Sequence, residues 1–470
     1  MSRAYDALPV FAQNLACSFA GWQRARSRFT PYFERTLAEW ERTVDGPVER
    51  LHALQRERLD LLVRRARAHV PYYRDLPPPC EASDPLEAIT RTLAAIPMLE
   101  KTTYRERSEA FVAGDVARGR LRRGKTSGTT GSALPLWYTP ETLAEEFAAV
   151  WRLRRSCGVR IGEPHLSFGG QIVVPFAQKR PPFWRTNFHG RQTLFSLYHM
   201  TPENLRAYVD AIHAAPARYV QGYPSSLHLV GRAMLEAKRP LPPGRLAAVF
   251  TSSESLLAFQ RETIEAAFGA PVRDRYGASE FAVSMTACAE NHLHVDMEFC
   301  IVEVEAREES DAWVRGPLLV TGLGNDATPF LRYRIGDFGT RLRQPCGCGR
   351  PGDVFLDIDG RIEDYVATPD GRLVGRLDHI FKDQLAVAEA QILQESPAAI
   401  EVRVVPRPEW DAASERELVK EIRSRLGDEI RVDLRLVGAI AREPNGKFRA
   451  VKSRVGLADA GKPWAAKGSS

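Results

Sequence analysis

The chain has 470 residues, of which 44% are hydrophobic, 26% charged and 9% aromatic, the composition of a globular rather than a disordered protein. Its length predicts two or three domains, and the net charge of +6 without a basic arm argues against nucleic-acid binding. No run of 18 or more apolar residues occurs, so we expect no membrane-spanning helix. Seven cysteines without a secretory signal predict reduced thiols and a cytoplasmic protein.

The N-terminal segment from Leu8 to Trp22 is fairly apolar but is interrupted by Gln13 and Asn14. It is too short and too polar to span a bilayer and makes a poor signal peptide, so we expect it to dock onto the body of the protein or onto a partner. Residues 30–75 carry leucines at helical spacing, which predicts helix up to the break at Val70-Pro71.

Between about residues 120 and 340, short β-rich runs alternate with amphipathic stretches. The runs include Ala247 to Phe250 and Leu318 to Val320, and the helical stretches include Pro202 to Ala214 and Leu257 to Phe268. Such alternation predicts a large α/β body.

After about residue 360 a smaller unit begins. We expect strands over Ile400 to Val405 and Ile430 to Val437, with a helix over Ser414 to Leu426, in a compact α+β domain of about 100 residues. The predicted fold class is therefore α/β, with a large N-terminal domain and a smaller C-terminal α+β domain. We place the helical part of the large domain at 1–119, the rest of it at 120–361 and the C-terminal domain at 362–470.

The stretch from Gly119 to Thr126 matches the Walker A pattern literally, but we reject that interpretation. A Walker loop follows a buried strand and opens a helix, whereas no apolar run precedes Gly119. Glycines and Pro135 follow where the helix should begin, and they cost about 1 and about 3 kcal/mol each inside a helix.

The next stretch is a better phosphate loop, because its glycines let backbone N–H groups close on phosphate oxygens and its hydroxyls add donors. It consists of Ser127, Gly128, Thr129, Thr130, Gly131 and Ser132. Taken alone, this segment is equally well interpreted as a Ser/Thr/Gly surface loop.

Five blocks in chain order resemble the motifs of the adenylate-forming superfamily, which includes acyl- and aryl-CoA ligases, luciferases and peptide-synthetase adenylation domains. They are Thr126 to Ser132, Tyr276 to Glu280, Tyr333 to Asp337, Gly360 to Asp364 and Pro444 to Lys447. Each block is weak alone, but five in order across about 320 residues are specific.

Three further stretches resemble the phenylacetate–CoA ligase group, and in particular its relatives encoded in capsular-polysaccharide clusters. They are Val70 to Arg74, Gln221 to Ser225 and Cys346 to Arg350, and the likeness runs from Pro9 to Lys447. It implies an AMP-forming ligase that adenylates a carboxylic acid, aryl or arylacetyl by family expectation, and transfers the acyl group to coenzyme A.

The resemblance also implies a role for each matching residue. ATP would be bound by the 127–132 loop, Glu254, Tyr276, Gly277, Ala278, Ser279 and Asp337, the last through the ribose hydroxyls. Glu280 would coordinate Mg²⁺, which prefers oxygen ligands, and Arg361 would pair with phosphate. Lys447 would be the catalytic cation, on a mobile C-terminal domain that rotates about Glu363 and Asp364 to admit a thiol.

Two departures from the superfamily pattern stand out. The phosphate loop usually ends in Pro-Lys, but Ala133-Leu134 occupies that place, so one phosphate cation is missing. The hinge position usually holds Asp or Lys, but here it is Glu363. Neither change removes a residue that the chemistry requires.

A set of cysteines and histidines predicts a structural zinc site. Cys346 and Cys348 form a close pair, and Cys288 lies upstream with His294 or His292, giving a Cys₃His set. The phenylacetate-ligase resemblance favours zinc, and the register of the family histidine favours His294. The alternative is a pair of reduced cysteines in a Gly-rich turn.

The carboxylate pocket should form from the Gln221 to Ser226 stretch, which includes Gly222, Tyr223 and Pro224, from Thr251 to Glu254, and from Ala278. The resemblance leaves three readings: a carboxylate–CoA ligase, a ligase that passes the acyl group to an amine, sugar or carrier protein in trans, and a non-catalytic nucleotide-binding protein. Retention of Glu280, Asp337, Arg361 and Lys447 argues against the third. A homodimer is left open.

Overall fold

The computed structural model describes residues 3–44, 46–125, 134–175, 177–200, 203–253, 256, 258–359, 366–369, 373–374, 377, 380, 386–438, 440, 451–453 and 455. The chain divides into two compact units. The first comprises residues 1–126, 135–335 and 339–358, and the second comprises 127–134, 336–338 and 359–470. The first is mixed α/β and the C-terminal region is α+β, which confirms the predicted fold class.

The first unit opens with helices that sequence signals delimit well. They are α1 (Arg3–Asp6), α2 (Val10–Arg28), α3 (Pro31–Glu41), α4 (Val48–His69), α5 (Pro85–Ala95) and α6 (Lys101–Glu106). The Thr30 and Asp84 side chains cap α3 and α5, each with proline at the first helical position. The single helix predicted over 30–75 is wrong in one respect, because α3 ends at Glu41 and a separate helix, α4, begins at Val48 after Pro47.

Helix α2 contacts the body through polar side chains and through Cys17, whereas its larger apolar side chains Phe11, Leu15 and Phe19 are exposed. The strand β4 (Trp184–Asn187) is an edge strand, so half of its backbone groups lack a strand partner. Asn14 Oδ1 accepts a hydrogen bond from the Thr186 amide at 2.9 Å, and Ser18 Oγ accepts one from the Phe188 amide at 2.9 Å. The predicted docking onto the body is confirmed. The two polar residues that interrupt the apolar segment make the contacts, since Gln13 Oε1 also accepts a hydrogen bond from Arg185 Nε.

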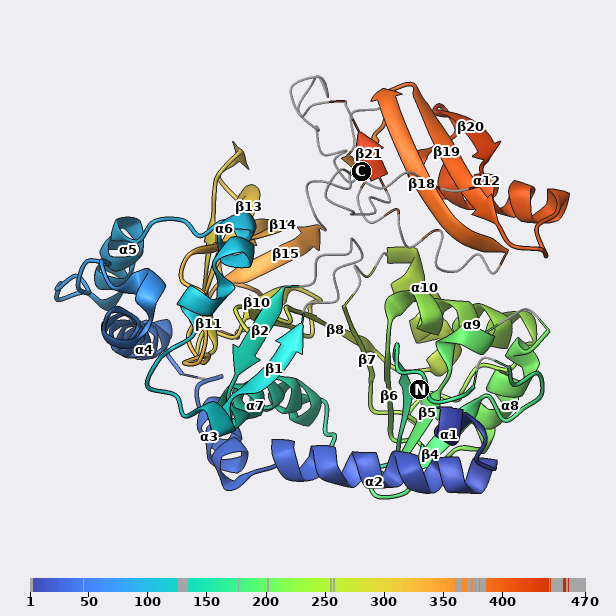
Figure 1. Ribbon diagram of the computed structural model, residues 1–470, viewed down its shortest axis with the longest axis horizontal. Coiled ribbons are helices and arrows are strands. Elements are labelled where there is room, and N and C mark those ends of the chain that lie inside the picture. Colours follow the sequence, from blue (N-terminus) through green and yellow to red (C-terminus); the bar gives the residue numbers. More distant parts are fainter. Residues whose placement is uncertain are drawn as a thin grey trace. The chain divides into compact units, whose positions relative to one another are not determined.

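A long mixed sheet forms the centre of the first unit (Figure 1). Its strands, in spatial order, are β11 (Cys300–Val304), β13 (Trp313–Gly322), β14 (Tyr333–Leu342), β15 (Val354–Asp359), β10 (Leu293–Val295), β9 (Ser284–Ala287), β8 (Val272–Gly277), β7 (Val249–Ser252), β6 (Tyr219–Gly222), β3 (His165–Phe168), β5 (Gln192–Phe195) and β4, with β12 (Glu308–Glu309) paired to β13. Strands β5, β3, β6, β7 and β8 run parallel. The β-rich runs predicted near residues 250 and 320 are confirmed as β7 and β13.

Helices α8 (Leu205–Ala214), α9 (Pro224–Glu236) and α10 (Ala258–Phe268) lie beside the parallel strands (Figure 1). Val220 and Val249 of the strands pack in one buried cluster with Leu227 of α9 and Ile264 of α10. Two of these helices confirm the stretches predicted from Pro202 and Leu257. Because strand side chains alternate between the two faces of a sheet, the residues next to Val220 and Val249 in their strands must point to the face opposite α9 and α10.

The remaining elements of this unit are short apart from α7 (Pro140–Ser156), whose N-cap Thr139 accepts from the Thr142 amide. They are β1 (Arg122–Lys125), β2 (Pro135–Tyr138), and the 3₁₀ turns Pro71–Tyr73, Ser108–Phe111, Arg118–Arg120 and Leu197–His199. Strands β1 and β2 pair antiparallel. No strand immediately precedes Gly119, so the rejection of the Walker A pattern is confirmed.

The second unit contains a four-stranded sheet with the spatial order β20-β19-β18-β21. Its elements are β18 (Val387–Ser396), β19 (Ala399–Pro406), α12 (Ala412–Leu426), β20 (Arg431–Leu436) and β21 (Val451–Ser453), with a small pair formed by β16 (Val366–Ala367) and β17 (Leu373–Val374). Ile392, Ile400 and Val402 of the sheet are buried against Leu418 and Ile422 of α12. The two strands and the helix predicted after residue 400 are confirmed. Within the described part of both units, no helix is long and apolar enough to cross a membrane.

Candidate active site

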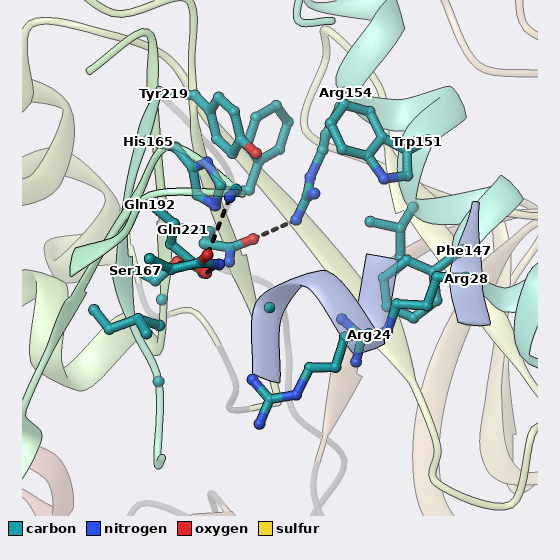
Figure 2. A pocket seen from close by; sticks show the side chains of 18 of the residues that line it. Arg24, Arg28, Phe147, Trp151, Arg154, His165, Ser167, Gln192, Tyr219 and Gln221 are labelled. Atoms are coloured by element: carbon teal, nitrogen blue, oxygen red, sulfur yellow. Dashed lines mark hydrogen bonds between the residues drawn. The ribbon is translucent and has the colours of Figure 1, made fainter. Parts of the chain in front are cut away.

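A cavity of about 520 Å³ lies on one face of the parallel strands of the first unit. Strands β3, β5, β6 and β7 form its floor, and helices α2 and α7 contribute its other wall (Figure 2). Ligands of open α/β sheets bind near the carboxyl ends of the strands, and the cavity reaches Phe168, Gly222 and Ser252 at three such ends. This position makes the cavity the leading candidate for a substrate site.

The strand register explains which side chains reach the cavity floor. His165 lies beside Gln192 and Tyr219, and two residues further along β3, Ser167 lies beside Gln221 of β6. All five side chains lie on the same face, because strand side chains repeat with a period of two, and all five line the cavity. The opposite face carries the apolar core with α9 and α10.

A chain of hydrogen bonds crosses this floor, as the dashed lines of Figure 2 show. Gln192 Nε2 and Gln221 Nε2 each donate to Ser167 Oγ at 2.7 Å. Arg154 of α7 donates to Gln221 Oε1. Because both amides are held by Ser167, the oxygen of Gln221 is fixed in the direction of Arg154.

Five residues of the predicted carboxylate pocket line this cavity, among them Gln221. Gly222 and Tyr223 do so, together with Thr251 and Ser252, whereas Pro224 is the buried first residue of α9. Gly222 has a steric reason for its identity, since a Cβ there would lie 2.7 Å from the Cβ and carbonyl oxygen of Phe168. Ala278, also predicted for this pocket, is absent from the lining.

Two of the predicted nucleotide blocks meet where Tyr333 contacts Glu280. Tyr276 and Gly277 end strand β8, and Ala278 and Ser279 follow in the turn that leads to Glu280. Glu280 is buried and accepts a hydrogen bond from Tyr333 Oη at 3.3 Å. Tyr333 begins β14, the strand that also holds Asp337.

Asp337 is itself nearly buried, with 9% of its surface exposed. It directly follows Gly336, whose φ of +94° is a conformation that suits glycine. The remaining predicted nucleotide and hinge residues lie outside the described residues. They are Ser127, Gly128, Thr129, Thr130, Gly131, Ser132, Glu254, Arg361, Glu363, Asp364 and Lys447.

The predicted cysteine and histidine residues converge at the ends of β9, β10 and β14. The donor atoms of Cys288, His294, Cys346 and Cys348 all lie within 4.8 Å of one another. Cys288 Sγ is 3.8 Å from Cys346 Sγ, and His294 Nε2 is 3.3 Å from Cys348 Sγ. His292 is also close, with Nδ1 3.2 Å from Cys346 Sγ.

The geometry of this cluster fits a tetrahedral metal. Sulfur atoms bonded to zinc at about 2.3 Å lie about 3.8 Å apart in a tetrahedral shell, and the separation of Cys288 Sγ from Cys346 Sγ is 3.8 Å. His294 is fully buried, and burial together with the Arg350 charge lowers its pKa to about 4. Its ring is therefore neutral at pH 7, the form that binds metals.

A buried ion cluster borders the cysteine and histidine residues. Arg152 Nη2 lies 2.7 Å from Asp296 Oδ1 and its Nη1 lies 2.6 Å from Glu298 Oε1. Arg350, two residues after Cys348, also contacts Asp296 at 2.9 Å. Sequence reasoning did not find this cluster, since its members are scattered over about 200 positions.

Sequence reasoning also missed the arginines that line the cavity. Arg24 and Arg28 come from α2, Arg154 from α7 and Arg275 from β8. The spacing of Arg24 and Arg28 places both on one face of a helix and could have indicated a basic face. Nothing in the local sequence connects that face with Arg154 or Arg275.

Comparisons with known proteins identify the relatives of the chain. The family described as "CapK C-terminal domain" matches residues 366–454, a stretch that includes Lys447. CapK of Staphylococcus aureus is 24% identical over 453 residues, which cover 95% of this chain and 97% of CapK. A phenylacetate–coenzyme A ligase of Thermus thermophilus is 24% identical, covering 86% of this chain and 97% of that enzyme. The chain is a homologue of CapK and of phenylacetate–coenzyme A ligases.

A second phenylacetate–coenzyme A ligase, from Pseudomonas putida, is 24% identical and covers 87% of this chain and 95% of that enzyme. Among solved structures, a 2-hydroxyisobutyryl-CoA ligase in the postadenylation state superposes with a TM-score of 0.58 at 20% identity. That match covers 88% of this chain and 91% of the ligase, so the two share a fold. The resemblance to adenylate-forming ligases inferred from the motifs is confirmed.

Proposed function

We propose that the protein is an ATP-dependent, AMP-forming ligase that adenylates a carboxylic acid and transfers the acyl group to coenzyme A. The observation that carries this proposal is the match with two phenylacetate–coenzyme A ligases along nearly their whole length. The shared fold with 2-hydroxyisobutyryl-CoA ligase and the cavity at the carboxyl ends of the parallel strands support it. The acid would bind in that cavity.

The first half-reaction joins two anions, a carboxylate and ATP. Its barrier arises from their repulsion and from charge at the α-phosphate, so catalysis is mainly positioning and electrostatic stabilisation. Glu280 would coordinate Mg²⁺, and its hydrogen bond from Tyr333 supports a fixed carboxylate there. Asp337 would accept hydrogen bonds from the ribose, and the loop from Ser127 to Ser132 would hold phosphate oxygens.

The cations of the reaction would come from the second unit. Arg361 would pair with phosphate, and Lys447 would place its ammonium at the bridging oxygens. The C-terminal domain would then rotate about Glu363 and Asp364 for the transfer to the thiol. The match of residues 366–454 to the CapK C-terminal domain supports a domain of this type in the chain.

The cysteine and histidine residues would hold a structural zinc ion. Three thiolates and the His294 imidazole would supply the four ligands of a structural zinc site, which would leave no open position for catalysis. The zinc would cross-link three segments, because Cys288 follows β9, His294 lies in β10, and Cys346 and Cys348 follow β14. Among the described residues the cysteines form no disulfide that could take this role. His292 would stay outside the shell and border Cys346.

Loss of this zinc is expected to destabilise the large domain. Purified protein should contain one zinc per chain, and Cys348→Ser should lose it and unfold at a temperature lower by about 5 °C or more. Elemental analysis and thermal denaturation measure the two effects. Cys80→Ser, at a partly exposed cysteine outside the cluster, is the control and should keep both zinc and stability. Full stability of metal-free protein would contradict the zinc assignment.

A panel of acids tests the proposed function and its acceptor. Pyrophosphate release from ATP is measured with many carboxylic acids, with and without coenzyme A, and acyl products are identified by mass spectrometry. We expect release that depends on an acid and an acyl-CoA product when coenzyme A is present. Release without acyl-CoA formation would favour an amine, sugar or carrier as acceptor. No release with any acid would leave a non-catalytic nucleotide-binding protein.

A further inference from the structure

The cavity carries far more positive charge than its lining neutralises. Four guanidinium groups line it, from Arg24, Arg28, Arg154 and Arg275. Among the described lining residues Glu146 is the sole carboxylate, and its Oε1 forms an ion pair with Arg275 Nη2 at 2.9 Å. In the part of the chain that the structure describes, Arg24, Arg28 and Arg154 therefore form no ion pair with a carboxylate, and the attraction of Glu146 for Arg28 only partly offsets their charge.

Arg154 is held in place by aromatic rings and not by an acid. Its guanidinium lies 4.8 Å from the ring of Trp151, 5.3 Å from that of Tyr219 and 5.8 Å from that of Phe250. Its polar contact is with Gln221, and its Nε is buried without a hydrogen-bond partner. A guanidinium has five N–H donors, so most of the donor capacity of Arg154 remains for a ligand.

Arg28 of α2 repeats this arrangement on the same wall as Arg154 (Figure 2). Its guanidinium lies 4.2 Å from the centre of the Phe147 ring. Burial, followed by the charges of Arg24 and Arg154, lowers the pKa of Arg28 to about 10. The pKa of Arg154 is also lowered, by burial and by Arg275. These neighbouring cations repel one another, and a bound anion would relieve that repulsion.

We propose that the acid bound in this cavity carries a second anionic group, such as a carboxylate or sulfonate, which Arg154 and Arg28 bind. This inference rests on the proposed function, because it takes the cavity as the acid site. The fork of a guanidinium binds two oxygens of one anion at once. The rings of Trp151, Tyr219 and Phe250 pack around the rest of the acid and exclude water from the ion pair.

The test compares matched acids on the full-length protein. The pairs are phenylacetate with 4-carboxyphenylacetate, and butyrate with glutarate. Calorimetric titration with AMP present measures binding, and pyrophosphate release from ATP measures turnover. We expect the wild-type protein to bind the dianionic member of each pair at least about 10-fold more tightly. Arg154→Gln should lose this preference and keep its affinity for the monoanionic member.

Arg155→Gln is the matched control, because Arg155 follows Arg154 on α7 but is exposed, pairs with Glu41 at 3.0 Å and does not line the cavity. It should keep the preference. Arg28→Gln repeats the test from a different helix if Arg154→Gln does not fold. Equal binding of both members of each pair by the wild-type protein would overturn the inference, as would a preference that survives in Arg154→Gln and Arg28→Gln. The proposed function fails separately, when no acid releases pyrophosphate.

Discussion

Replacement of Lys447 by alanine is expected to lower the rate of adenylate formation by on the order of 10² to 10³-fold or more, while ATP still binds. The lysine would neutralise charge that develops between the carboxylate and the α-phosphate, so its loss affects the transition state more than the ground state. Single-turnover measurement of acyl-AMP gives the rate, and calorimetry gives the affinity for ATP.

Lys420 supplies the control for this experiment. It lies on the exposed side of α12 in the same unit, so Lys420→Ala removes one positive charge from that unit without touching the assigned chemistry. Its adenylation rate should match that of the wild-type protein. Full adenylation by Lys447→Ala would refute the role assigned to that lysine, and the ligase function would then need another cation.

Asp296→Asn is expected to lower the free energy of unfolding by about 3 to 5 kcal/mol. The change leaves Arg152 and Arg350 buried with Glu298 as the remaining carboxylate partner. It also weakens the bond that Ser284 Oγ donates to Asp296 Oδ2 at 2.6 Å. Urea denaturation followed by tryptophan fluorescence measures the loss. Asp210→Asn, at an exposed ion pair with Arg239, should leave the free energy of unfolding close to that of the wild-type protein.

The same cluster predicts a pH dependence. Burial alone would raise the pKa of Asp296, but the charges of Arg152 and Arg350 and the bond from Ser284 outweigh it and lower the pKa to about 2. A carboxylate with a depressed folded pKa stabilises the native state above its unfolded pKa of about 3.9 and loses that contribution as pH falls toward 2. The wild-type protein should therefore lose its advantage over Asp296→Asn between about pH 4 and 2. An advantage that stays constant over that range would contradict the assignment.

Local sequence signals were sufficient for most elements, and the cysteine and histidine set was predicted from its donors together with the phenylacetate–CoA ligase resemblance. The alternation of apolar and polar residues from Ile400 to Val405 and the apolar stripe from Ser414 to Leu426 can each be recognised within one short stretch of sequence. Both predicted elements are present, as β19 and α12. The close pair Cys346 and Cys348 indicated a metal site, and the resemblance selected His294 over His292 as the histidine ligand. Their convergence then follows from the pairing of β10 with β9 and β15.

The arginine cavity could not be predicted in the same way. Strands β3 and β6 have only four residues each, too few for alternation to show that Ser167 and Gln221 share a face. Which helix covers that face depends on long-range packing, and α2 packs through Asn14 and Ser18 because the edge strand β4 needs hydrogen-bond partners.

The measurement that tests the central claim most directly is the exchange of labelled pyrophosphate into ATP. Exchange requires reversible formation of an enzyme-bound acyl-adenylate and does not depend on the acceptor. We expect exchange that requires both Mg²⁺ and a carboxylic acid, proceeds without coenzyme A, and is lost in Lys447→Ala. Absence of exchange with every acid of the panel, from folded protein that binds ATP, would contradict the assignment of the chain as an adenylating ligase.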